Sequence, residues 1–201
     1  MSSISASTTS TTGFKVTADT TGTLVLQTGA TPTTAVTIDG SQNVTFANAI
    51  TPTQTGGIVG TTTNNNANAG SVGEYIASTV LQASRVALTS GTPVNVTSIS
   101  LTAGDWDVTG LLGLSENSSV AWTYYVGSIS SVSATLSTLQ TNSSTGSVNS
   151  STLAVVNVYF PLPVVRISLA STTTYYLVAQ GSFTGGSGQA AFGTIRARRV
   201  R

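Results

Sequence analysis

Apolar side chains recur at every second position over residues 72–201, in short runs separated by clusters of turn residues. A period of two places the apolar groups on one face of a β-strand. Repeated at this spacing, the pattern is typical of an all-β sandwich or barrel. We count about eight strands, and the sequence indicates no helix beyond a turn near residues 74–81. Eight antiparallel strands in a segment of this length predict a jelly-roll-like β-sandwich.

Three of these runs make sharper predictions. Residues 94–101 change phase after Val96, which predicts a β-bulge within one strand. Residues 120–126 alternate in a way that puts Trp122 and Tyr124 on the same face. Residues 153–160 are apolar on both faces apart from Asn157, which predicts a strand that is buried on both sides or lies at an interface.

An internal repeat precedes this domain. The segment VTADTTGTLVLQ (Val16 to Gln27) aligns with VTIDGSQNVTFA (Val36 to Ala47). Each copy predicts a strand, a turn and a second strand, with an aspartate (Asp19 or Asp39) at the turn, where its side chain accepts hydrogen bonds from nearby backbone amides. Two such short units cannot bury a core alone. We therefore expect them to stack on other copies of the chain, as in an intertwined trimeric stem.

Residues 51–71 separate the repeat from the sandwich. They read TPTQTGGIVGTTTNNNANAGS, with an asparagine run, several glycines and few large apolar groups, which is typical of a linker or an extended arm. The predicted organisation is an N-terminal β-repeat attachment or stem module over residues 1–50, the linker or arm over 51–71, and the C-terminal β-sandwich over 72–201.

The composition excludes several kinds of chemistry. The 201 residues include no His and no Cys, so there is no His- or Cys-ligated metal site, no serine–histidine pair and no disulfide. Only six carboxylates occur, which leaves little material for acid–base catalysis. We predict no enzymatic activity, no catalytic residue, no cofactor and no bound metal. Ser and Thr supply 66 residues and charged groups only 13, which favours a surface covered by other copies, although threonine-rich exposed β-surfaces also occur in monomers.

The basic residues are concentrated at the C-terminal end. Four of the seven lie in the last six positions, whereas residues 1–195 carry three bases and six acids. Without any further basic stripe this cluster is a poor nucleic-acid footprint, so we predict no nucleic-acid partner. Charges that finish an edge strand or pair across a subunit contact are the better interpretation. The predicted subunit-interface candidates are Phe192, Arg196, Arg198 and Arg199, and removal of the last six residues is predicted to abolish trimerisation.

Asp105 and Asp107 flank Trp106 and, being two apart on a strand, would project from the same face. Such a pair is a candidate for glycoside hydrolysis or for a hard-cation site. Aspartates are common at strand entrances and the sequence offers no further ligands beside them, so we favour a structural role for both.

Six aromatic residues in the strands are candidates for stacking on sugar rings. Trp122, Tyr124 and Tyr125 are the ones we single out as possible glycan contacts. Strand aromatics are more often core or interface residues, because they bury large areas and fit the pleated surface.

No segment of the sequence predicts export or membrane insertion. The first residues, MSSISASTTSTTG, lack the basic start and apolar stretch of a signal peptide. The longest apolar run is interrupted by Pro161 and Pro163 and falls far short of the ~20 residues of a membrane helix. We expect synthesis in the cytoplasm, with no signal peptide and no membrane insertion.

Several segments are similar to a known group of proteins. LTAGDWDVTG (Leu101 to Gly110), TTTYYLVAQGSF (Thr172 to Phe183) and GTIRARRVR (Gly193 to Arg201) resemble a C-terminal domain of tailed-bacteriophage virion proteins of the tail-fibre or head-decoration type. The N-terminal repeat resembles segments of phage fibre proteins. The resemblance implies a homotrimer attached to the virion by one end and made in a bacterial host.

The sequence leaves more than one function open. The first is a fibre or spike component whose C-terminal knob contacts a host-surface glycan or protein. The second is a capsid decoration protein, of the cement or head-fibre kind, that stabilises the shell. A polysaccharide hydrolase is a remote alternative because titratable groups are scarce, and a bacterial adhesin is disfavoured by the missing export signal.

Overall fold

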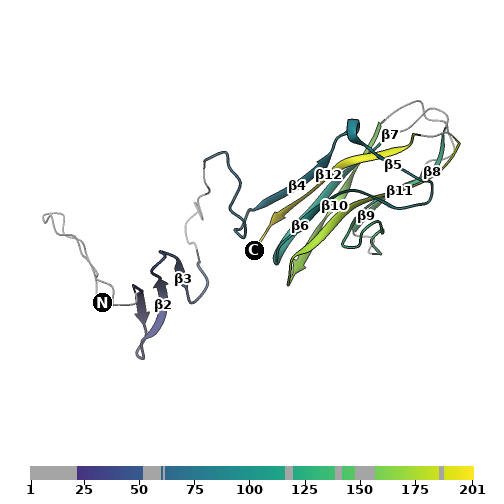
Figure 1. The fold of residues 1–201 in the computed structure, drawn as a ribbon. Helices are drawn as coiled ribbons and strands as arrows, with labels where there is room; N and C mark the ends of the chain where they lie inside the picture. Colours follow the sequence, from purple (N-terminus) through teal and green to yellow (C-terminus); the bar gives the residue numbers. More distant parts are fainter. Residues whose placement is uncertain are drawn as a thin grey trace. The chain divides into compact units, whose positions relative to one another are not determined.

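The computed structural model describes residues 22–51, 60, 62–115, 120–138, 142–147, 157–185 and 188–201. The chain divides into two compact units, Met1–Thr63 and Asn64–Arg201, which Figure 1 shows in purple to blue and in blue to yellow. The division falls within the predicted linker, and residues 64–71 belong to the second unit. There the Asn66 amide donates to the Tyr75 carbonyl over 2.8 Å.

The first unit contains a three-stranded antiparallel sheet in the order β1-β2-β3, with β1 at Leu24–Thr28, β2 at Thr33–Ile38 and β3 at Val44–Phe46. The turn between β2 and β3 is built by Asp39. Its carboxylate accepts the backbone N–H groups of Ser41 and Asn43, each over 2.9 Å. These bonds confirm the turn role predicted for Asp39, whereas Asp19 and the first half of its repeat lie outside the described residues.

The second unit is a two-layer β-sandwich. One sheet has the order β10-β7-β12-β4, with the two-residue β5 also paired to β12, and the other has the order β6-β11-β8-β9. The strands span Tyr75–Val80 (β4), Val86–Ala87 (β5), Val94–Leu101 (β6), Gly104–Ser115 (β7), Ala121–Ser130 (β8), Ser143–Ser147 (β9), Asn157–Leu169 (β10), Thr173–Thr184 (β11) and Ala190–Arg199 (β12). A short 3-10 helix, η1, covers Gln82–Ser84.

The order of these strands is that of a jelly roll. With the short β5 set aside, the first sheet takes the sixth, third, eighth and first strands of the unit, and the second takes the second, seventh, fourth and fifth. With β5 set aside, every consecutive connection except that from β8 to β9 crosses between the two sheets, as in two interlocked Greek keys. The all-β class and the jelly-roll-like sandwich predicted from the alternation are confirmed.

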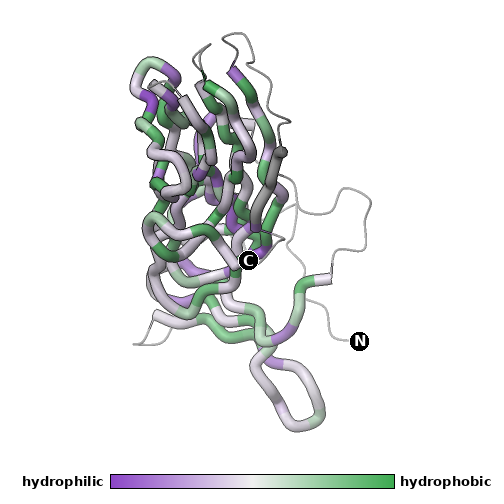
Figure 2. The backbone as a smooth tube through the Cα atoms, turned by 90° about the vertical axis from the view of Figure 1, so that its right-hand side faces the viewer, coloured by the Kyte–Doolittle hydropathy of each residue, from purple (hydrophilic) through white to green (hydrophobic). Residues whose placement is uncertain are grey.

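The core lies between the two sheets and follows the predicted alternation. Trp106, Leu112, Ile129, Leu177 and Ile195 are fully buried, with larger and smaller apolar neighbours filling the space between them. Figure 2 shows the corresponding change of hydropathy from residue to residue along the strands. The predicted bulge in β6 is also confirmed, because the pairing with β11 skips Val96.

Two local predictions are wrong, and one strand is longer than the sequence pattern indicates. Residues 75–80 form the strand β4 and not a helical turn, because they pair with β12 along their whole length. The chain runs through Pro161 and Pro163 as one continuous strand, β10, because β10 lies at the edge of its sheet, where a missing N–H is tolerated. The alternation through residues 120–126 breaks because the pairing of β8 with β11 skips Thr123.

Candidate functional site

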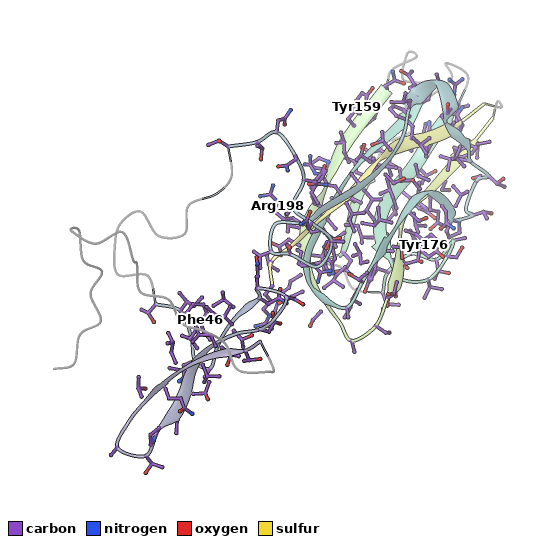
Figure 3. All side chains as sticks on the ribbon, turned by 60° about the vertical axis from the view of Figure 1, so that its left-hand side comes forward. Phe46, Tyr159, Tyr176 and Arg198 are labelled. Carbon is purple, nitrogen blue, oxygen red and sulfur yellow. The ribbon has the colours of Figure 1, made fainter. Side chains whose placement is uncertain are left out.

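The outer face of the sheet β10-β7-β12-β4 carries three of the four predicted interface residues, Phe192, Arg196 and Arg198. Register fixes the neighbours: Arg198 lies between Tyr75 on β4 and Asp107 on β7, and Arg196 lies between Ala77 and Thr109. Directly opposed residues of antiparallel strands project from the same face. Figure 3 shows Arg198 and Tyr159 on this sheet.

Arg196 and Arg198 border a hollow in this face, which we call the arginine hollow. It has a volume of about 280 Å³ and is lined by Tyr75, Asp107, Thr109, Val164, Arg196 and Arg198. Val164 is 64% exposed and the Tyr75 ring is 38% exposed, so apolar surface lies beside the two guanidinium groups. Neither arginine side chain makes a hydrogen bond or an ion pair with any residue that the structure describes.

Asp105 projects from the same strand as Asp107 but is fully engaged within the chain. The Arg166 guanidinium donates to both of its oxygens over 3.0, 3.0 and 2.7 Å, and Arg201 donates to the same carboxylate over 2.9 Å. The hydrogen bonds from Arg166 hold the pKa of Asp105 below its usual range, against the effect of burial. Asp105 is therefore an ionised carboxylate held in place by two arginines of its own chain.

Arg199 lies on the opposite, inward side of β12. It is 4% exposed and donates from Nε to Glu74 over 2.9 Å, from Nη1 to the Ala103 carbonyl over 2.8 Å, and from Nη2 to the Thr102 hydroxyl. Its guanidinium also lies 4.2 Å from the ring centroid of Trp106. The predicted place of Arg199 at a subunit contact does not hold, because its donors are satisfied inside its own chain.

Phe192 forms the floor of a second hollow on the outer face, with a volume of about 300 Å³. Its ring is only 5% exposed and meets Tyr159 edge-on at 5.4 Å between ring centroids. The rim is supplied by Leu81, Leu111 and Tyr159, which are 67%, 43% and 55% exposed. Phe192 is thus buried by its own chain, and the exposed apolar surface belongs to its neighbours.

The three aromatics predicted as glycan contacts do not form one platform. Trp122 is 1% exposed and packs on Phe183 with ring centroids 5.0 Å apart, so its ring is not available to a sugar. Tyr125 is half-buried and packs on Phe160 at the same distance. Tyr124 points away from them, because of the bulge at Thr123, and its hydroxyl accepts a long hydrogen bond from Gln180, 3.4 Å.

The small sheet of the first unit carries an apolar face. Register opposes Leu24 to Ile38, Leu26 to Val36, Val36 to Phe46 and Ile38 to Val44, so these six side chains share one side. Leu26, Val44 and Phe46 are 50%, 51% and 48% exposed, and Figure 3 shows Phe46 on this sheet. We call this surface the stem face.

Sequence reasoning missed Tyr75 and Val164 as members of a site. Tyr75 falls in the segment expected to be a turn, and its place beside Arg198 follows only from the pairing of β4 with β12. Val164 is exposed by the register shift in β10 between Leu162 and Val165. The alternating residues of Tyr75–Val80 are the sequence signal that would have predicted a strand here.

The described residues offer neither a metal site built from carboxylates nor a membrane-spanning helix. They contain no group of three or more Asp or Glu side chains placed to hold a metal ion. Among the same residues, no helix has the length and apolar character needed to cross a membrane.

The second unit is therefore an eight-stranded jelly-roll sandwich with one amphipathic outer sheet face. No family model matches the chain, and no curated protein sequence is similar to it at a significant level. Among solved structures it is similar to chains from infectious bursal disease virus. The Gx strain structure matches with 15% identity and a TM-score of 0.39, covering 71% of this chain and 37% of the viral one.

Two further structures of the same virus give comparable values. The Gt strain structure matches with 14% identity and a TM-score of 0.37, covering 82% of this chain and 41% of that one. The crystal structure of the T13 particle matches with 14% identity and a TM-score of 0.39, covering 79% and 37%. The chain thus spans about two fifths of these viral chains, and similarity at this level carries no conclusion about function.

Proposed function

We propose that the chain is a non-enzymatic structural component of a bacteriophage virion: a homotrimeric fibre or spike-like protein, attached by one end, that presents its sandwich for host-surface contact. The observation that carries the proposal is the stem face. Six large apolar side chains lie on one side of a three-stranded sheet, and three of them are about half exposed within the chain. The apolar face of a sheet is stable when it is buried against another layer.

Covering the stem face with other copies gives a clear energetic gain. Burying the exposed half of a Leu, Val or Phe side chain contributes about 1 kcal/mol. Leu26, Val44 and Phe46 together therefore supply about 3 kcal/mol per copy, before the partly buried members of the face are included. Three stem faces turned toward a common axis form one closed apolar core, which is the arrangement implied by the resemblance to phage fibre proteins.

The low charge of the chain supports the same proposal. Glu74, Asp105 and Asp39, three of its six acids, are already bonded within the chain. Charged residues are depleted at the cores of protein interfaces, so a chain with 13 charged residues among 201 is compatible with a largely covered surface. The jelly roll itself recurs in viral capsid and lectin domains, so the fold is compatible with a particle-bound role.

The place of the protein on the particle tests this proposal. Virions carrying a gold-labelled antibody fragment against the sandwich are imaged by electron microscopy. Label at the tail, together with blocked adsorption of virus by the purified protein, supports the fibre role. Label distributed over the capsid shell contradicts it and favours decoration. Absence of the protein from purified virions overturns the proposal altogether.

A further inference from the structure

The arginine hollow contains two cations that form no ion pair with any residue that the structure describes. Arg166 and Arg201 bind Asp105, and Arg199 binds Glu74. Arg196 and Arg198 are exposed, make no ion pair with any described residue, and lie two residues apart on one face of β12. That separation is about 7 Å between Cα atoms. Guanidinium groups placed in this way are suited to grip a planar anion through paired hydrogen bonds.

The described part of a second copy supplies few carboxylates that could pair with these arginines. Among the described residues its carboxylates are Asp39, Glu74, Asp105 and Asp107. The first three are engaged by Asn43, Arg199 and Arg166 respectively. Asp107 lies in the hollow itself. The described carboxylates of a second copy are therefore either engaged within their own chain or part of the same hollow.

The remaining lining describes the rest of the ligand. The Tyr75 ring, 38% exposed, and the Val164 side chain, 64% exposed, present apolar surface beside the cations. Such surface packs against the C–H face of a sugar ring. The Thr109 hydroxyl and the Asp107 carboxylate, on β7, are hydrogen-bonding groups for hydroxyls. A hollow of about 280 Å³ is at the small end of ligand pockets and suits one ring.

The charge of the site selects among acids. Two arginines and one aspartate leave the hollow with a net charge of +1 at neutral pH. A carboxylate carries a single negative charge, which matches the net charge of the hollow, whereas a phosphate monoester carries about −1.5 to −2 and exceeds it. We propose that the arginine hollow is a binding site for a carboxylate-bearing sugar, such as a uronic acid unit of an acidic polysaccharide. This inference needs only the sandwich unit and is independent of the proposed place in the virion.

The test measures sugar binding to the full-length chain by ligand-observed NMR titration. The probes are methyl β-glucuronide, methyl β-glucoside and glucose 6-phosphate. We expect the glucuronide to bind with a Kd in the millimolar range, typical of one ring with a single ion pair, and the neutral glucoside to bind about tenfold more weakly. Stronger binding of the phosphate sugar than of the glucuronide overturns the assignment to carboxylates, and absence of glucuronide binding up to about 50 mM overturns the site.

Variants locate the binding. The double variant Arg196→Gln/Arg198→Gln is expected to weaken glucuronide binding about tenfold or more, and Tyr75→Ala to weaken both methyl glycosides. Arg198→Lys keeps the charge but loses the paired donors, so its affinity for the glucuronide should lie between that of the parent chain and that of the double variant. The matched control is Arg85→Gln, which removes an exposed arginine outside the hollow. Equal losses in the control and in the double variant would show non-specific attraction and refute the proposal.

Discussion

The Arg199 guanidinium donates to the Glu74 carboxylate over 2.9 Å, with both side chains buried, and so joins residues 125 positions apart. The backbone repeats the connection, because Arg199 donates to the Glu74 carbonyl and Gly73 donates to the Arg199 carbonyl, each over 2.9 Å. The first and last strands of the jelly roll are thereby closed against each other. The C-terminal strand is thus a structural element of the sandwich, whatever its outer face binds.

Replacing Arg199 by Met should destabilise the sandwich strongly. The change leaves the Glu74 carboxylate buried without its cation, which costs about 3 kcal/mol or more. Urea unfolding followed by tryptophan fluorescence measures the loss. The matched control is Arg198→Met on the exposed side of the same strand, which should stay within about 0.5 kcal/mol of the parent. Equal losses in the two variants would contradict the buried role of Arg199.

The bonded Glu74 carboxylate makes the stability of the sandwich depend on pH. The Gly70 backbone N–H, donating over 2.8 Å, and then the Arg199 guanidinium hold the pKa of Glu74 below its usual 4.5, although burial opposes them. Since the pKa is lower in the folded chain, the contribution is complete above the usual value and is lost as the pH falls through the folded value. Urea midpoints measured from pH 7 to 2 should fall below about pH 4.

A variant separates Glu74 from the other carboxylates in that titration. Asp105 behaves in the same direction, because the Arg166 hydrogen bonds lower its pKa from 3.8. Glu74→Gln should therefore be less stable at neutral pH and should lose less stability on acidification than the parent chain. An unchanged pH dependence in Glu74→Gln would show that Glu74 is not the titrating group.

Gly113 leaves the space that Phe192 occupies. A Cβ at Gly113 would lie 2.4 Å from the Phe192 ring, so Gly113→Ala is expected to destabilise the sandwich by about 1–3 kcal/mol. Combining it with Phe192→Leu should recover part of that loss relative to the single variants. Strict additivity in this double-mutant cycle, measured by urea unfolding, would contradict the predicted contact.

Trp122 is predicted to contribute to stability and not to sugar binding. It is 1% exposed in the core, so Trp122→Leu should cost about 2–4 kcal/mol in urea unfolding. Under conditions where the variant remains folded, its glucuronide affinity should equal that of the parent chain. A selective loss of affinity without loss of stability would return Trp122 to the list of glycan contacts.

The alternation of apolar residues predicts the sandwich because each strand must present one face to the same core. It even places Arg199 correctly, on the side of β12 shared with Ile195 and Ala197. The pattern does not reveal which groups accommodate a buried Arg199. Its guanidinium is bound by Glu74 and lies over the Trp106 ring. Gly104, whose φ is +138°, leaves room for it, because a Cβ there would collide with the guanidinium. A charged residue read as an interface contact is instead part of the interior.

The site depends on register, which single strands do not reveal. The neighbours of Arg198 follow from the pairing of β12 with β4 and β7, distant in sequence. Likewise, nothing in the β-compatible residues around Thr123 signals the bulge that separates Tyr124 from Trp122. The stem face, in contrast, follows from the sequence. The internal repeat aligns Leu24 with Val44 and Leu26 with Phe46, and in each copy the two apolar residues are two positions apart and so share one face of a strand.

The mass of the 201-residue chain in solution tests assembly through the stem face most directly. Sedimentation equilibrium of the purified chain should give three times its 20.3 kDa, and Leu26→Asp, which places a charge on the stem face, should shift the protein to monomer with its sandwich still folded. The matched control is Val25→Asp, on the other side of the same strand, which should remain trimeric. A monomeric parent chain, or a trimer that Leu26→Asp leaves intact, would contradict assembly through the stem face.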